Sequence, residues 1–178
     1  MKNLFLYILF ALLLPFTSKG QSNSEKKDSL IVLAYPNSLD ELLKGFKGQV
    51  VYIDILASWC KPCLEEFEHS KKLEAYFKEN NIIKLFITID QSQDIDKCIE
   101  ILNRESMTGY FAHYSPKEGK FNQFAKDIND IFLKDENGNL LISIPRYGIV
   151  NKNGELVVKN ANRPSNPEEL KKQMQAYF

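Results

Sequence analysis

Residues 50–63 read VVYIDILASWCKPC, a continuous apolar run that ends in two cysteines three positions apart. An unbroken, β-branched apolar run is typical of a central strand that is covered on both faces. Pro62 suits the first turn of a helix, because the amide that proline lacks has no helical partner there. The stretch therefore predicts a buried strand over 50–57, a turn at Ser58 and Trp59, and a helix over 61–78.

Cys60 and Cys63 can form and break one disulfide. The thiolate is the form that attacks a disulfide, and a free cysteine with a pKa of about 8.5 is mostly protonated at neutral pH. Cys60 comes just before a helix, where unpaired amides and the positive end of the helix dipole favour its charged form. Lys61 adds little as an exposed, flexible cation. We expect Cys60 to attack and Cys63, one turn deeper, to resolve the mixed disulfide.

Two acids are candidates for taking the proton of Cys63. Asp54 lies between Ile53 and Ile55, where an unpaired charge is costly and burial raises the pKa of a carboxyl. Glu66 comes three positions after Cys63, on the same face of the expected helix. The plainer alternatives are an Asp54 that hydrogen-bonds a nearby amide at a strand end, and a Glu66 that is an ordinary solvated acid.

Strands and helices alternate on both sides of the cysteine pair. Apolar patterning predicts strands at 30–33, 82–89 and 110–114, and helices at 39–46, 94–104, 120–128 and 166–178. Two hairpins are expected, one joining 131–133 to 140–142 across Asn137 and Gly138, and one joining 148–150 to 155–158. This alternation implies a mostly parallel sheet with right-handed crossovers.

The first twenty residues have the pattern of an export signal: Lys2, then an apolar core over 4–14, then a polar, small-residue exit up to Gly20. The apolar stretch is short of the roughly 20 residues of a comfortable membrane span. We therefore expect a signal peptide at 1–20, a flexible lead-in at 21–29 and one domain at 30–178 that is exported to the periplasm, with an uncleaved membrane anchor as the alternative.

Composition excludes several classes of protein. The 178 residues carry 23 basic and 23 acidic side chains, so there is no electrostatic reason to expect a nucleic-acid partner. Three cysteines are too few for a disulfide framework. A metal site is not expected, because beyond the pair only Cys98, His69 and His113 could serve as ligands. Cys98 lies on an apolar helix stripe and is expected to be a buried spectator.

Residues 30–178 resemble the thioredoxin fold, and specifically the exported thiol-disulfide oxidoreductases of the TlpA and ResA type. Four separated features carry the resemblance: the residues from Trp59 to Cys63 after a buried strand, Asp54 six positions before the first cysteine, Glu66 three after the second, and Ile144-Pro145 in the place of the family's cis-proline. The resemblance implies a three-layer α/β fold, with a central mixed sheet and helices on both faces.

The resemblance also implies an activity. This activity is exchange of disulfides with protein or peptide substrates through the Cys60/Cys63 dithiol. The resemblance favours a reductase over an oxidase, with a membrane electron donor that keeps the pair reduced. No cofactor beyond the disulfide is implied. Trp59, Lys61 and Pro62 would support the site. Ile144 and Pro145 would form the opposite wall, where an extended substrate segment could pair with the backbone of Ile144.

Two alternatives and two departures from the family pattern stay open. The alternatives are a non-catalytic binding module with an inert disulfide and, less favoured, a thiol peroxidase. Glu68 stands where these proteins usually have a proline that kinks the active-site helix, so the helix is expected to bend less or by another means. The hairpin at 132–142 is an insertion before Pro145 that leaves substrate preference undecided.

Overall fold

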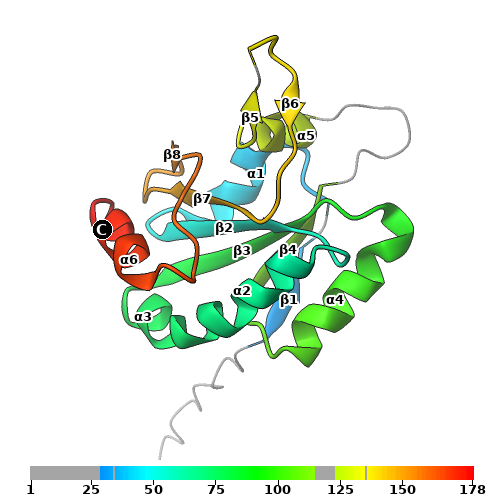
Figure 1. The fold of residues 1–178 in the computed structure, drawn as a ribbon. Coiled ribbons are helices and arrows are strands. Elements are labelled where there is room, and N and C mark those ends of the chain that lie inside the picture. The colour runs from blue at the N-terminus through cyan, green and yellow to red at the C-terminus, as the bar shows by residue number, and fades with distance from the viewer. Residues whose placement is uncertain (1–28, 34, 115–122, 135) are drawn as a thin grey trace, which may run out of the picture.

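The computed structural model describes residues 29–33, 35–114, 123–134 and 136–178, and its centre is a six-stranded sheet (Figure 1). The strands follow the order β1-β4-β3-β2-β7-β8, where the first four are parallel and β7 and β8 are antiparallel to their neighbours. Their bounds are β1 (Leu30–Val32), β2 (Val50–Leu56), β3 (Ile82–Thr88), β4 (Gly109–His113), β7 (Arg146–Val150) and β8 (Leu156–Val158). A separate hairpin consists of β5 (Leu133–Lys134) and β6 (Leu140–Leu141).

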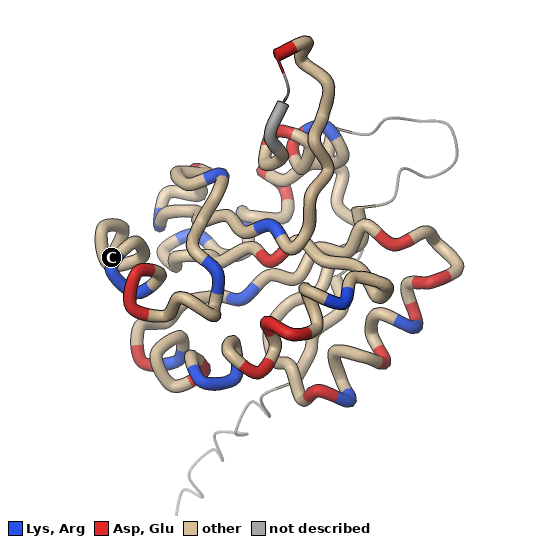
Figure 2. The backbone as a smooth tube through the Cα atoms, in the orientation of Figure 1, with Lys and Arg blue, Asp and Glu red and all other residues tan. Residues whose placement is uncertain are grey.

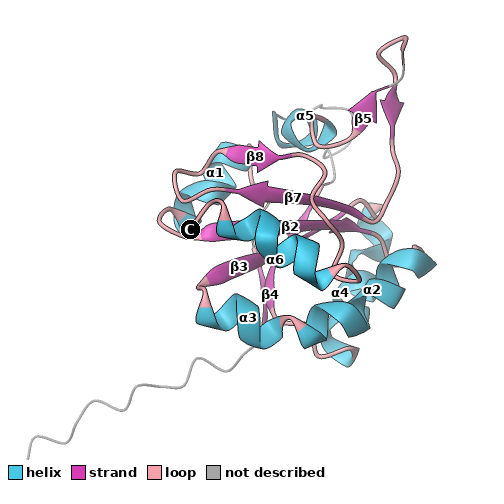
Figure 3. Ribbon diagram, turned by 60° about the vertical axis from the view of Figure 1, so that its left-hand side comes forward, coloured by secondary structure: helices cyan, strands magenta, loops and turns pink. Residues whose placement is uncertain are grey.

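Helices cover both faces of the sheet (Figure 3). Their bounds are α1 (Leu39–Leu43), α2 (Lys61–Lys72), α3 (Glu74–Glu79), α4 (Ile95–Arg104), α5 (Gln123–Asn129) and α6 (Pro167–Gln175), with 3₁₀ turns at Lys44–Phe46 and Ser92–Asp94. Residues of α1 and α5 pack with Ile53 and Ile55 of β2 on one face. Residues of α2, α3, α4 and α6 pack with Leu56, Tyr52 and their neighbours on the other. The expected three-layer α/β fold is confirmed.

The single helix expected over 61–78 is wrong, because the chain breaks it at Leu73 into α2 and α3. No proline causes the break. Leu73 keeps a near-helical backbone, but its amide turns to the carbonyls of Ser70 and Lys71 instead of the one four positions back. Leu73 and Phe77 both enter the core cluster between the sheet and α6, so the change of direction keeps the apolar side of α3 against the sheet.

The other expected elements are present with bounds that differ by a few residues; β7, for example, begins at Arg146, two residues before the expected strand at 148–150. The inserted hairpin forms over β5 and β6, with Gly138 at positive φ in its turn. The expected helix at 120–128 begins at Gln123 in the described chain, and residues 120–122 lie outside it. The expected signal peptide and nearly all of the lead-in also lie outside the described residues. Within the described part of the chain, every helix is too short or too polar to cross a membrane.

Gly109, at the start of β4, gives a direct test of the sheet. Its φ is +134°, and a Cβ built there would lie 2.7 Å from the carbonyl oxygen of Lys84 on the neighbouring strand. We expect Gly109→Ala to lower the free energy of unfolding by about 2 to 4 kcal/mol, because backbone strain and a clash with main chain add. Urea denaturation measures it. Gly45→Ala is the control, since a Cβ there meets nothing within 4 Å, and equal effects of the two changes would contradict this account.

Candidate active site

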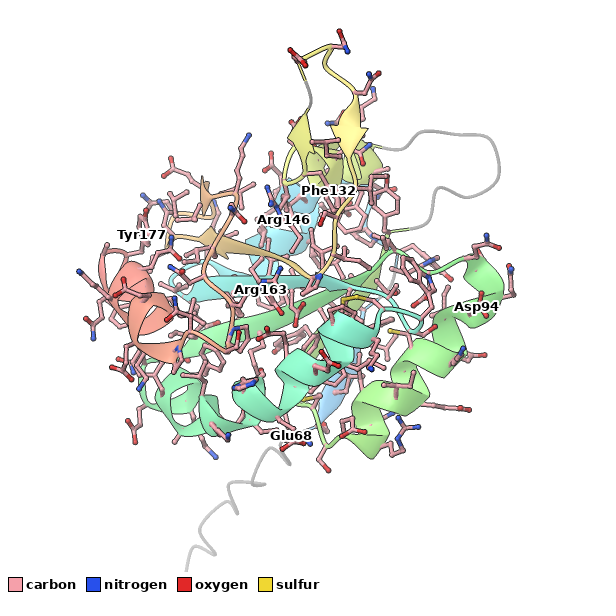
Figure 4. All side chains as sticks on the ribbon, in the orientation of Figure 1. Glu68, Asp94, Phe132, Arg146, Arg163 and Tyr177 are labelled. Atoms are coloured by element: carbon pink, nitrogen blue, oxygen red, sulfur yellow. A yellow bond between two sulfur atoms is a disulfide. The ribbon has the colours of Figure 1, made fainter. Side chains whose placement is uncertain are left out.

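Cys60 and Cys63 form a disulfide where β2 gives way to α2 (Figure 4). The S–S distance is 2.08 Å, and the two residues are 4% and 1% exposed. Both belong to the core cluster that contains Phe67 of α2 and Phe86 of β3. The turn places the cysteine pair at the edge of the core and not in open solvent. A substrate must therefore reach the disulfide at the surface of this turn.

Cys60 is the N-cap residue of α2. Its sulfur accepts a hydrogen bond from the amide of Cys63 at 3.3 Å, and its carbonyl oxygen lies 3.2 Å from the amide of Leu64. The free amides and the positive end of the helix dipole are therefore directed at Cys60, which stabilises a negative charge on this sulfur when the disulfide opens. Lys61 pairs with Glu65 at 3.8 Å, but both side chains are mostly exposed and contribute little.

Apolar residues surround the disulfide at the surface. Trp59 is 64% exposed, so its ring is available to a partner and is not a core aromatic. The peptide bond between Ile144 and Pro145 is cis, and Ile144 packs against the cluster that contains both cysteines. Pro62 occupies the first turn of α2, as expected. The structure thus brings two segments of the chain to one place: residues 59–63, with Trp59 and the cysteine pair, and the segment that contains Ile144.

Asp54 lies on β2 with its side chain on the face that α2 covers. It is 5% exposed, and its Oδ1 atom has no hydrogen-bond partner among the described residues. Burial and, to a smaller extent, the negative charge of Glu66 together raise the pKa of this carboxyl to about 8, against the opposing effect of the positive charge of Lys84. A carboxyl of that pKa can take and return a proton near neutral pH, as a general base must.

Glu66 is buried at 7% exposure, and it is tied to the chain that precedes α6. Its two carboxylate oxygens accept hydrogen bonds from the amide of Ser165 at 2.9 Å and from the hydroxyl of Ser165 at 2.8 Å. The alternative of an ordinary solvated acid at Glu66 is therefore wrong. The carboxylate acts on Asp54 as a fixed negative charge, and the two candidates for the proton have different surroundings.

Ser165 offers a test of this anchor. We expect Ser165→Ala to lower the free energy of unfolding by about 1 to 2 kcal/mol. The change removes the hydroxyl's hydrogen bond to the buried carboxylate of Glu66, whereas the hydrogen bond from the backbone amide of residue 165 remains. Urea denaturation of the oxidised protein measures the change. Ser143→Ala, at an exposed serine, is the control and should have no measurable effect. A Ser165→Ala variant as stable as this control would show that the side-chain bond is immaterial.

Sequence reasoning missed Ser165 and the buried pair Ser58 and Asp90. Ser165 is 99 positions from Glu66, and no local pattern links them. Ser58 and Asp90 follow adjacent parallel strands, and this common edge could have signalled their contact. Cys98 is buried as expected, and burial raises the pKa of its thiol to about 12, so it is unreactive. Among the described residues, no group of His, Cys, Asp and Glu could hold a metal ion.

The sheet, its covering helices and a cysteine pair at the start of α2 define a thioredoxin-like protein with a redox-capable disulfide. Residues 26–176 match the Redoxin family, and the chain belongs to that family.

Relatives and solved structures agree with this assignment. A 50-residue stretch is 32% identical to the thiol-disulfide oxidoreductase ResA of Bacillus thuringiensis subsp. konkukian and covers 28% of this chain and 29% of that protein. Two crystal structures share the fold. One, of a thiol-disulfide oxidoreductase from Bacteroides vulgatus, is 24% identical over 76% of this chain and 83% of that chain, with a TM-score of 0.55. The other, of a thiol:disulfide interchange protein DsbE from Chlorobium tepidum, is 22% identical over 76% of this chain and 84% of that chain, with a TM-score of 0.56.

Proposed function

We propose that this protein is a thiol-disulfide oxidoreductase that exchanges disulfides with protein or peptide substrates through Cys60 and Cys63. The observation that carries the proposal is the position of Cys60, which caps α2 and accepts the amide of Cys63. A buried acid, Asp54, with a pKa near 8 supplies the proton acceptor that the second cysteine needs. A disulfide that served only as a fastening would require neither feature.

The reaction follows from these positions. In the dithiol form the Cys60 thiolate attacks one sulfur of a substrate disulfide, and the other substrate sulfur leaves as a thiolate that takes a proton from water. Cys63 then gives its proton to Asp54 and attacks the sulfur of Cys60. The mixed disulfide breaks, the second substrate sulfur leaves as a thiolate that takes up the proton returned by Asp54, and the protein is left with the Cys60–Cys63 disulfide. Two electrons have passed from the protein to the substrate.

The reductase direction completes this proposal. A membrane electron donor would return the disulfide to the dithiol after each cycle, outside the cytoplasm, in a protein exported by residues 1–20. The membrane contact is permanent if that signal is not cleaved. The basic start, apolar core and polar exit of residues 1–20 support export, and the local identity with ResA supports the class of reaction.

Substrates would dock on the apolar surface around the turn. Trp59, Leu141 and Ile142 are exposed, and the last two precede the segment that packs Ile144 against the cysteine pair. Exposed apolar residues next to the disulfide in sequence and on the segment that leads to Ile144 suit an unfolded or extended polypeptide better than a small polar thiol. Basic and acidic residues are interspersed along the described chain (Figure 2), so we do not propose a nucleic-acid partner.

The reduction potential of the pair tests the direction. We expect equilibration with glutathione to give a value nearer −270 mV, about that of thioredoxin, than −120 mV, about that of DsbA. A value near −120 mV would make the protein an oxidase.

Insulin reduction by the dithiol form separates the enzyme from a binding module with an inert disulfide, because the binding module would give no turnover.

A further inference from the structure

A second group of buried polar side chains lies behind the turn that leads into Cys60. Its members are Ser58, Thr88, Asp90, Cys98 and His113, all of them almost inaccessible to solvent. Ser58 and Asp90 follow β2 and β3, Thr88 and His113 end β3 and β4, and Cys98 comes from α4. Because these three strands are adjacent and parallel, their carboxyl ends meet at one edge of the sheet. The exchange reaction described above uses none of the five.

Asp90 is the centre of this group. Its two carboxylate oxygens accept hydrogen bonds from the amide of Ser58 at 2.8 Å, the hydroxyl of Ser58 at 2.9 Å and the hydroxyl of Thr88 at 2.5 Å. Its backbone is fixed as well, since its amide donates to the Thr88 hydroxyl at 3.1 Å and its carbonyl oxygen lies 2.8 Å from Nε2 of His113. Together these hydrogen bonds hold the carboxylate of Asp90 in one orientation.

The effect of Asp90 reaches Cys60 through Ser58. Ser58 and Trp59 are the central residues of a turn that the amide of Cys60 closes by donating to the carbonyl oxygen of Ala57 at 3.0 Å. Trp59 is exposed, so packing of its side chain does not hold the turn. On the buried side of the turn, the carboxylate of Asp90 accepts hydrogen bonds from both donors of Ser58, its amide and its hydroxyl.

We propose that Asp90 is a positioning residue for disulfide exchange: it fixes Ser58 and thereby sets where the sulfur of Cys60 meets the first amides of α2. The proposal rests on Cys60 being the attacking sulfur, and it holds for either direction of electron flow. A turn without this anchor lets Cys60 move away from the amides, and the thiolate loses their stabilisation.

Asp90 also carries a charge, which acts in the opposite sense. A carboxylate near a thiol disfavours the thiolate, whereas the positioning of Cys60 favours it. Two substitutions separate these effects. Asp90→Asn removes the charge and keeps the shape, since its carbonyl oxygen can accept from the Ser58 amide and its NH₂ group can donate to the Ser58 hydroxyl. Asp90→Ala removes both the charge and the anchor, so the difference between the two variants isolates the anchor.

The experiment measures the pKa of the Cys60 thiol in the reduced protein, from the pH dependence of its alkylation by iodoacetamide, with the modified residue identified by mass spectrometry. We expect this pKa to be about one unit higher in Asp90→Ala than in Asp90→Asn, which is a tenfold smaller thiolate fraction at pH values below it. We also expect the equilibrium constant with glutathione to differ between the two variants by three- to tenfold.

A milder variant covers the case in which Asp90→Ala does not fold. Ser58→Ala removes one of the two bonds from Ser58 and should raise the pKa of the Cys60 thiol enough to reduce the thiolate fraction about threefold. Asp127→Ala is the matched control, because Asp127 accepts the amide of Leu39 at 2.8 Å on the opposite face of the sheet. It should lower stability and leave Cys60 unchanged.

Equal Cys60 pKa values in Asp90→Ala and Asp90→Asn would overturn the proposal, and so would a wild-type value in Ser58→Ala. The measurement needs no protein substrate. If the wild-type protein failed to reduce insulin, the proposed function would fall while the thiol titration still decided the role of Asp90.

Discussion

Cys60→Ser is expected to abolish insulin reduction, with a loss of about a thousandfold or more, because a serine hydroxyl cannot replace the thiolate nucleophile. Cys63→Ser should behave differently. Its Cys60 still sits at the N-terminus of α2 and still attacks, but nothing resolves the mixed disulfide. We therefore expect Cys63→Ser to accumulate a covalent adduct with a peptide disulfide, which mass spectrometry detects under non-reducing conditions.

Cys98→Ser is the control for both variants. Serine keeps a hydroxyl that can donate to Asp90 and accept from Thr88 in place of the thiol, and the buried thiol of Cys98 has a pKa of about 12, so the variant should reduce insulin like the wild type. Insulin reduction by Cys60→Ser at the wild-type rate would show that the pair is not the working group. An adduct on Cys60→Ser and none on Cys63→Ser would reverse the roles of the two sulfurs.

The strand, turn and helix around the cysteines could be predicted because their signals are local. The apolar run of β2, the proline in the first turn of α2 and the spacing of the cysteines all act within a few residues. The environment of Asp54 could also be predicted, since an acid in a buried strand is desolvated wherever that strand lies.

The rest of the site depends on contacts between distant segments. From the sequence, Glu66 is either a candidate for the proton of Cys63 or an ordinary solvated acid. Its burial depends on Ser165, 99 positions further along the chain. The helix break at Leu73 depends on how α3 packs beside α6, which no local pattern contains. From the sequence alone Asp90 is only an acid near the end of a strand. Its contact with Ser58 depends on the parallel register of β2 and β3.

Asp54→Asn is expected to change how stability depends on pH. Asp54 is buried, and its pKa is raised from an ordinary 3.8 to about 8. Below about pH 4 the carboxyl is protonated in both the folded and the unfolded chain and contributes no difference. Between pH 4 and pH 8 the unfolded chain releases this proton and the folded chain keeps it, so stability falls as pH rises. The loss levels off above pH 8, at an upper limit of about 6 kcal/mol.

The variant should lack this fall. An asparagine at the same place leaves an unpaired amide in the core, but that cost does not depend on pH, so the slope is the quantity to compare. Urea denaturation of the oxidised proteins from pH 4 to pH 9 measures it, with the disulfide closed so that Cys60 and Cys63 do not titrate. Glu65→Gln, at an exposed acid of α2, is the control and should keep the wild-type slope. A wild-type slope in Asp54→Asn would contradict the raised pKa.

The same substitution decides which acid takes the proton of Cys63. If Asp54 is the acceptor, Asp54→Asn should slow resolution of the mixed disulfide by about a hundredfold and remove the pH dependence near 8, because a positioned general base contributes that much. Glu66→Gln should instead shift this pH dependence to lower values, because it removes a negative charge that raises the pKa of Asp54. Glutamine can still pair with Ser165, through an oxygen that accepts from the amide and a nitrogen that donates to the hydroxyl.

The two variants therefore give different results in a stopped-flow measurement of how fast the mixed disulfide is resolved: the pH dependence is lost in Asp54→Asn and displaced in Glu66→Gln. A pH dependence lost in Glu66→Gln and retained in Asp54→Asn would assign the proton to Glu66.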